Sequence, residues 1–204
     1  MKECVMDAKQ KQFLHRLLEP YQALVQRCAQ NDLVAAEIND VIASACELAV
    51  SAAHFLESQG LPAQTGAGED IRLKLADVAD TYKHGALRNP ERIVTFDTIF
   101  AWEFNDQDEC RFLRVEILVR NERFGSLDLV PTIGAYLQHL NSSLGLGFGS
   151  IEPNIPAKPF TAEAVLEVTR RTVVVPKARI RTYKRNANGE LVLTDVNLVR
   201  FVVR

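Results

Sequence analysis

The helical part of this chain ends in the stretch DVADTYKHGALR, residues 77–88. Apolar side chains recur through this stretch and just before it at intervals of four, three and four residues: Ile71, Leu75, Val78 and Tyr82. That spacing predicts a helix with one buried face. Gly85 suits its C-terminal cap, and Pro90 prevents its continuation. We therefore expect a helix that begins near Glu69 and ends at this stretch.

Four charged or titratable side chains gather in the last turn of that helix: Asp80, Lys83, His84 and Arg88. Residues three or four apart are neighbours on a helix, so Asp80 can reach Lys83 or His84, with Arg88 one turn beyond. In the preferred interpretation these charges cap the helix and join it to the rest of the protein. In the alternative, Asp80 orients His84 for acid–base chemistry while Lys83 or Arg88 binds an anion, as in a metal-independent nuclease or defence-related protein.

A helix that carries Asp77, Asp80 and a terminal Lys83-His84, preceded by two longer helices and followed by a β region, resembles a pattern in uncharacterised bacterial proteins. The resemblance implies a helical bundle joined to a β region and no particular activity. The HEPN helical-bundle ribonucleases instead carry an arginine followed within a few residues by a histidine. Here Arg88 follows His84 and Arg72 lies too far upstream, so that motif is not matched.

The composition is that of an ordinary globular protein, with 47% hydrophobic and 25% charged residues in 204 positions. Charge is unevenly distributed: residues 170–204 hold nine basic and two acidic side chains, a net charge of +7, against −9 for residues 1–169. The N-terminus has no apolar leader, and no apolar run is long enough to cross a membrane. We therefore expect a cytoplasmic protein that does not enter membranes.

Cysteines and histidines show no pattern of a metal site. The four cysteines are scattered without CxxC pairs, which favours reduced, buried thiols. His15 and His54 lie among apolar residues, and we expect packed or surface histidines without a carboxylate neighbour. No metal or other cofactor is predicted.

The fold class predicted from periodicity is α+β. Residues 1–90 are expected to form an antiparallel helical bundle, with helices over 7–29, 34–56 and from 69 onward, and with a kink or break near Glu19 caused by Pro20. Residues 91–204 are expected to form a mainly antiparallel sheet, with a hairpin over 93–120 that has one buried face and a covering helix near 131–144. The two parts could also be one continuous domain.

A second hairpin is predicted at the basic C-terminal end, where residues 190–204 return as a strand. A two-residue loop, Asn188-Gly189, would mix polar and apolar side chains on each face. A three-residue loop that begins at Ala187, with Gly189 left-handed, separates the faces and is preferred; Arg181 then faces Asp195. This register places four side chains in a row as a candidate binding surface: Arg179, Arg181, Tyr183 and Arg185.

Such a row can bind phosphates by charge and bases by stacking, or it can be solvated or paired with acidic residues of the same chain. The second interpretation is preferred because the protein as a whole is acidic. The sequence thus predicts a non-enzymatic interaction protein that binds another protein, a second copy of itself or an anionic partner. A nuclease that uses the His84 cluster and a nucleic-acid-binding module that uses the basic hairpin are the alternatives.

Overall fold

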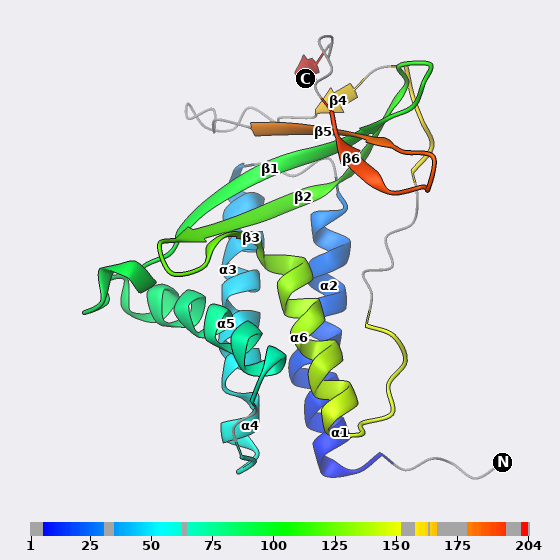
Figure 1. Cartoon of the computed structure of the whole chain (residues 1–204). Coiled ribbons are helices and arrows are strands. Elements are labelled where there is room, and N and C mark those ends of the chain that lie inside the picture. The colour runs from blue at the N-terminus through cyan, green and yellow to red at the C-terminus, as the bar shows by residue number, and fades with distance from the viewer. Residues whose placement is uncertain are drawn as a thin grey trace, which may run out of the picture.

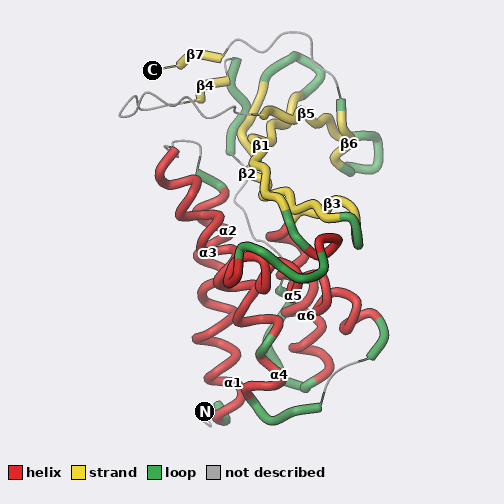
Figure 2. Tube along the Cα trace, turned by 90° about the vertical axis from the view of Figure 1, so that its left-hand side faces the viewer, coloured by secondary structure: helices red, strands yellow, loops and turns green. Residues whose placement is uncertain are grey.

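The protein has a helical layer and a curved β-sheet that lies across one end of it (Figures 1 and 2). The computed structural model describes residues 6–30, 35–62, 65–151, 158–162, 164–166, 179–194 and 201–203. The predicted α+β class is confirmed. In the described part, no helix is both long and apolar enough to span a bilayer.

Near Glu19, where a kink or a break was expected, the first helix continues past Pro20 but contains a π-helical turn. It consists of α1 (Ala8–Phe13), a π-helical turn η1 (Leu14–Leu18) and α2 (Glu19–Cys28). In η1 the Glu19 N–H donates to the carbonyl of Leu14, five residues earlier. Proline clashes with the carbonyl four residues before it, and a wider turn makes room for the ring. The π-turn therefore accommodates Pro20 within a continuous helix.

The next helices confirm most of the predicted boundaries. α3 spans Ala35–Ala53, a short α4 spans Phe55–Ser58, and α5 spans Ala67–His84. Gly85 caps α5 with a φ of 68°, as expected from its position. Tyr82, predicted to be in the apolar stripe, is instead 43% exposed, whereas Asp77 is buried. The buried face of α5 is rotated toward Asp77 because the start of the β region covers that side of the helix.

The main sheet has the strand order β3-β2-β1-β5-β6. β1 (Thr95–Phe104) is antiparallel to β2 (Cys110–Asn121), and β2 is antiparallel to β3 (Gly125–Asp128). β5 (Arg179–Arg185) runs parallel to β1 and antiparallel to β6 (Leu191–Leu193). The sheet is therefore mostly antiparallel, as predicted.

The C-terminal hairpin has the register of the three-residue loop. Tyr183 pairs with Leu193 and Arg185 with Leu191, and Gly189 has a φ of 79°. The predicted partners Asp195, Val196 and Asn197 lie outside the described residues. The expectation of one returning strand over residues 190–204 is wrong, because β7 (Phe201–Val203) pairs in parallel with β4 (Ala164–Leu166) in a separate two-stranded sheet.

One face of the β1–β2 hairpin shares a core with the helices through Val115, Ile117 and Val119. α6 (Leu129–Ser143) follows β3 directly, begins at an Asp128 cap, and contacts both the helical layer and β2. The expectation of a single buried face is wrong, since Glu103 and Glu116 on the opposite face are also buried. Side chains of β5 cover them, and this arrangement creates the first candidate site.

Candidate functional site

The structure does not bring the predicted acid–base cluster together. Asp80 accepts a hydrogen bond from Arg92 (2.6 Å) rather than from His84 or Lys83. Lys83 Nζ lies 3.3 Å from Nε2 of His54 on the neighbouring helix. His84 and Arg88 are exposed and make no polar side-chain contact with the described residues. The Asp80–His84 pair that the chemistry requires is therefore absent from this part of the chain.

The neighbouring Asp77, buried in the same helix, is the centre of a junction between α5 and the sheet. Its carboxylate accepts from Arg92 Nε (2.7 Å), Asn121 Nδ2 (3.1 Å) and Arg123 (3.2 Å). Arg92 lies in a 3₁₀ turn, η2 (Pro90–Arg92), and it bridges Asp77 and Asp80. Asp77 and Asp80 thus join α5 to the residues that follow it, whereas His84 and Arg88 take no part in this contact.

The predicted basic row lies beside buried carboxylates on one face of the sheet. The β1–β5 register places Arg179, Arg181 and Tyr183 beside Ile99, Ala101 and Glu103. On the next strand, Glu116 accepts from Arg181 (2.7 Å) and from the Tyr183 hydroxyl (2.8 Å). Because β1 lies between β5 and β2, these contacts hold the side chains of Arg181 and Tyr183 across the surface of β1.

The two ends of the row are held in the same way. Arg185 Nε and Arg111 Nε each donate to the buried carboxylate of Glu103 at 2.8 Å. Arg179 pairs with Asp97 on β1. Every cation of the predicted row therefore has a carboxylate partner within the sheet, and a guanidinium held by one carboxylate still has N–H groups to offer a ligand.

Asp128 and Arg114 form a further pair beside Glu116. Arg114 donates to Asp128 at 2.6 Å and lies 3.7 Å from Glu116. Burial raises the pKa of Asp128 above its usual value, and the positive charge of Arg114 opposes that rise. Asp128 also accepts from the N–H of Val130 as the cap of α6, so this pair fixes the start of the helix.

Strand β6 adds exposed aliphatic side chains beside the row. Leu191, Val192 and Leu193 have exposed fractions of 40%, 49% and 63%. Leu193 pairs with Tyr183 and Leu191 with Arg185, so both leucines lie on the same face as the arginines. We call the surface formed by Arg179, Arg181, Tyr183, Arg185, Leu191 and Leu193 the β5–β6 face.

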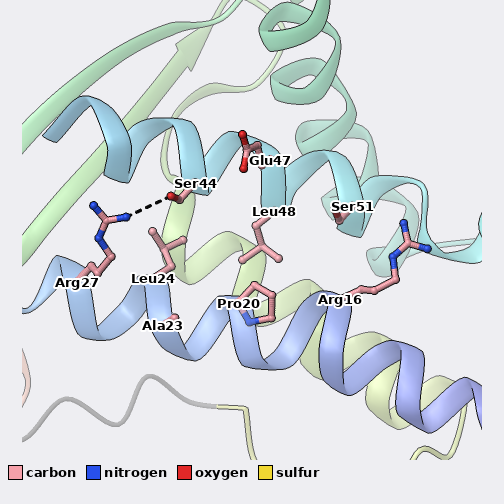
Figure 3. A pocket seen from close by; sticks show the side chains of 9 residues that line it. All are labelled: Arg16, Pro20, Ala23, Leu24, Arg27, Ser44, Glu47, Leu48 and Ser51. Atoms are coloured by element: carbon pink, nitrogen blue, oxygen red, sulfur yellow. Dashed lines mark hydrogen bonds between the residues drawn. The ribbon is translucent and has the colours of Figure 1, made fainter. Parts of the chain in front are cut away.

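A second candidate site is a groove of about 330 Å³ between the first helix and α3 (Figure 3). Apolar side chains lie along its middle, with polar and charged groups around them: Arg16, Pro20, Ala23, Leu24, Arg27, Ser44, Glu47, Leu48 and Ser51. Figure 3 shows Arg27 and Arg16 near opposite ends, with Leu24, Pro20 and Leu48 between them. Arg27 contacts Ser44 Oγ at 3.5 Å.

Sequence reasoning missed both the aliphatic part of the β5–β6 face and the groove. The groove has a signal in the sequence, since Arg16, Pro20, Ala23 and Arg27 follow one another at intervals of four, three and four residues. The partners of the basic row, Glu103 and Glu116, had no local signal because they come from other strands. The predicted absence of carboxylate neighbours for the histidines is wrong: His15 contacts Glu19 at 2.9 Å and His54 contacts Glu57 at 3.1 Å.

Both histidine pairs lie at the surface, and neither belongs to a metal site. Within the described part, no three His, Cys, Asp or Glu side chains are placed to hold a metal ion. Cys28, Cys46 and Cys110 are free and buried, as predicted for reduced thiols, while Cys4 lies outside the described residues. In comparisons with protein families, curated proteins and solved structures, none matches this chain.

Proposed function

We propose that this protein is a non-enzymatic interaction module that binds another protein through the β5–β6 face. The observation that carries the proposal is the row of exposed aliphatic side chains on β6, placed directly beside Arg and Tyr side chains. Arginine and tyrosine are the residues that most often dominate protein–protein interfaces, and exposed aliphatic neighbours supply the area that is dehydrated on binding.

The electrostatics of the face favour a protein over a nucleic acid. Glu103 and Glu116 are nearly fully buried beneath Arg185 and Arg181, and Asp97 pairs with Arg179, so the cationic charge is largely compensated. Phosphate backbones are bound mainly through uncompensated positive charge. The carboxylates already hold the guanidinium groups in place, and these groups can donate hydrogen bonds to carbonyl and carboxylate groups of a protein surface. The arginine side chains then lose little further entropy on binding.

The helices and the Asp77 junction are consistent with a scaffold that supports the β5–β6 face. The contact around Asp77 is filled, which is the arrangement expected of a structural junction and not of a catalytic cleft. We infer that the helices act as an antiparallel bundle, with α6 as the helix that covers the sheet, and that this layer holds the β5–β6 face rigid.

A photo-crosslinking experiment tests the proposal. A photoreactive amino acid at Leu193 should give a crosslink to one defined protein, whose affinity is then measured with both proteins purified. We expect Leu193→Glu and Arg181→Glu each to weaken that affinity at least about tenfold, because each removes a contact at the centre of the face.

Tyr82→Glu provides the matched control, since Tyr82 is an exposed aromatic residue of α5, outside this face, and its substitution should leave the affinity unchanged. Equal affinities of all three variants would overturn the proposal. A crosslink only to a second copy of the chain, together with a dimer in sedimentation that Leu193→Glu dissociates, would replace the separate partner by self-association. Binding to RNA or DNA that weakens steeply with salt would identify a nucleic-acid-binding module instead.

A further inference from the structure

The π-turn of the first helix borders the groove between that helix and α3. Pro20 is accommodated by the π-turn η1, and Arg16 lies inside that turn. π-turns carry a cost in regular helices and occur frequently at functional sites. Here the wider turn sets Arg16 at one end of the groove, beyond Pro20 and on the side of Ser51 (Figure 3).

The two arginines of the groove differ from the arginines of the sheet. Those of the β5–β6 face and of the Asp77 junction each pair with a carboxylate. Among the residues that the structure describes, Arg16 has no polar side-chain partner, and Arg27 has only the long contact to the Ser44 hydroxyl. The two guanidiniums that flank the groove therefore keep their capacity to bind an anion.

The one acidic residue of the groove forms no ion pair with either arginine among the described residues. Glu47 is turned toward α5, where its Oε1 accepts from the hydroxyl of Tyr82 at 3.4 Å. Between the two cations the groove is lined by Pro20 and Ala23 at the surface and by Leu24 and Leu48 beneath them. Along the first helix the groove thus presents a cation, an apolar middle and a second cation, while Ser44, Glu47 and Ser51 line it from α3.

We propose that this groove is a binding site for a small anionic amphiphile, an acyl chain with a carboxylate at one or both ends. The chain would lie over Leu24 and Leu48, and the carboxylates would meet Arg16 and Arg27. Eleven residues separate the arginines, which is roughly 16 Å along a helix and suits a chain of medium length. A volume of about 330 Å³ lies at the lower end of the range for small-molecule sites.

Linear dicarboxylates titrated into the whole protein, followed by the backbone resonances in NMR spectra, test the proposal. Octanedioate, decanedioate and dodecanedioate should shift the resonances of groove residues such as Ala23 and Ser51. Each probe has two methylenes more than the one before it, and the open groove buries about half of each methylene. Affinity should therefore rise about fourfold from one probe to the next. Arg16→Gln and Arg27→Gln should each weaken binding of dodecanedioate about threefold to tenfold.

Matched controls separate the effect of the arginine charges from those of groove filling and of misfolding. Arg88→Gln removes an exposed arginine outside the groove and should change nothing. Ala23→Phe fills the groove at an exposed helical position and should abolish binding, while an unchanged circular dichroism spectrum shows that the variant is folded. The neutral diol of eight carbons should bind more weakly than octanedioate.

Three results would overturn the proposal. The first is the absence of shifts in the groove at millimolar probe. The second is an affinity that is independent of chain length or equal for the diol. The third is a dimer in which the groove is already covered by a second copy of the chain.

Discussion

The Nε atom of Arg92 lies 2.7 Å from Oδ1 of Asp77, a carboxylate with no exposed surface. Removing that carboxylate leaves Arg92 and Arg123 without their shared partner, so Asp77→Ala should lower the free energy of unfolding by about 3 kcal/mol in urea denaturation. Asp80 is partly exposed and pairs only with Arg92 among the described residues, so Asp80→Ala should lower the free energy of unfolding by less than about 1 kcal/mol. Equal losses for the two variants would show that Asp77 is not the centre of the junction.

Gly85 ends α5 with a φ of 68°, a conformation that is strained for other residues. Gly85→Ala should therefore lower the free energy of unfolding by about 1 kcal/mol, even though a Cβ there meets no atom within 4 Å. Gly149 also has open space around its Cβ position but no positive φ, and Gly149→Ala should be neutral. Thermal unfolding of both variants measures the difference, and a neutral Gly85→Ala would contradict the cap.

Gly134 in α6 lets Tyr21 approach the helix closely. A Cβ at Gly134 would lie 2.2 Å from the Tyr21 hydroxyl oxygen, so Gly134→Ala should destabilise the protein by about 2 kcal/mol despite the better helix propensity of alanine. The hydroxyl has no partner among the described residues, so Tyr21→Phe alone should be nearly neutral. Gly134→Ala should then cost less in the Tyr21→Phe background, and additive effects in a double-mutant cycle would argue against this contact.

Alkaline pH should destabilise the fold through its buried thiols. Burial raises the pKa of Cys28 and of Cys46 from 9.0 to about 12. The unfolded chain loses these protons first, so stability is intact below about pH 9 and falls as the pH rises toward 12, by up to about 1.4 kcal/mol per pH unit for each thiol. Unfolding in urea at about pH 8 and about pH 10.5 should show this decline.

A variant isolates the thiol contribution from other groups that titrate in the same range. Cys46→Ala removes one of the two groups, so its stability should fall less steeply with pH than that of the parent protein. Parallel declines in the two proteins would mean that Cys46 is not responsible. Iodoacetamide should also react slowly with both thiols in the folded state, because the thiolate is the reactive form.

Local sequence signals predicted much of the fold. Gly85 and Pro90 marked the end of α5, and Gly189 selected the register of the C-terminal hairpin, because each acts within a few residues along the chain. The parallel pairing of β5 with β1 and the separate pairing of β4 with β7 depend on contacts between distant segments. Periodicity within one strand carries no information about such partners.

The candidate sites were predicted only as far as single strands or helices reach. The row from Arg179 to Arg185 followed from alternation in one strand, but its carboxylate partners Glu103 and Glu116 come from two others. The spacing of Asp80 and His84 allowed a contact that the structure does not form, and Asp80 instead accepts from Arg92, which lies outside the helix. A charged pair inferred from helical spacing must compete with every cation that the tertiary fold brings close.

The π-turn at Leu14–Leu18 has a consequence for the N-terminal end of the molecule. A π-turn is equivalent to one residue inserted in an α-helix, and each α-helical residue rotates the chain by about 100°. Phe13 precedes the turn and packs against Phe148 and Phe55, with ring centroids 5.4 and 5.8 Å away. Deletion of one residue from this turn would rotate Phe13 about the helix axis and away from both rings, so one extra residue keeps the start of the chain aligned with its core.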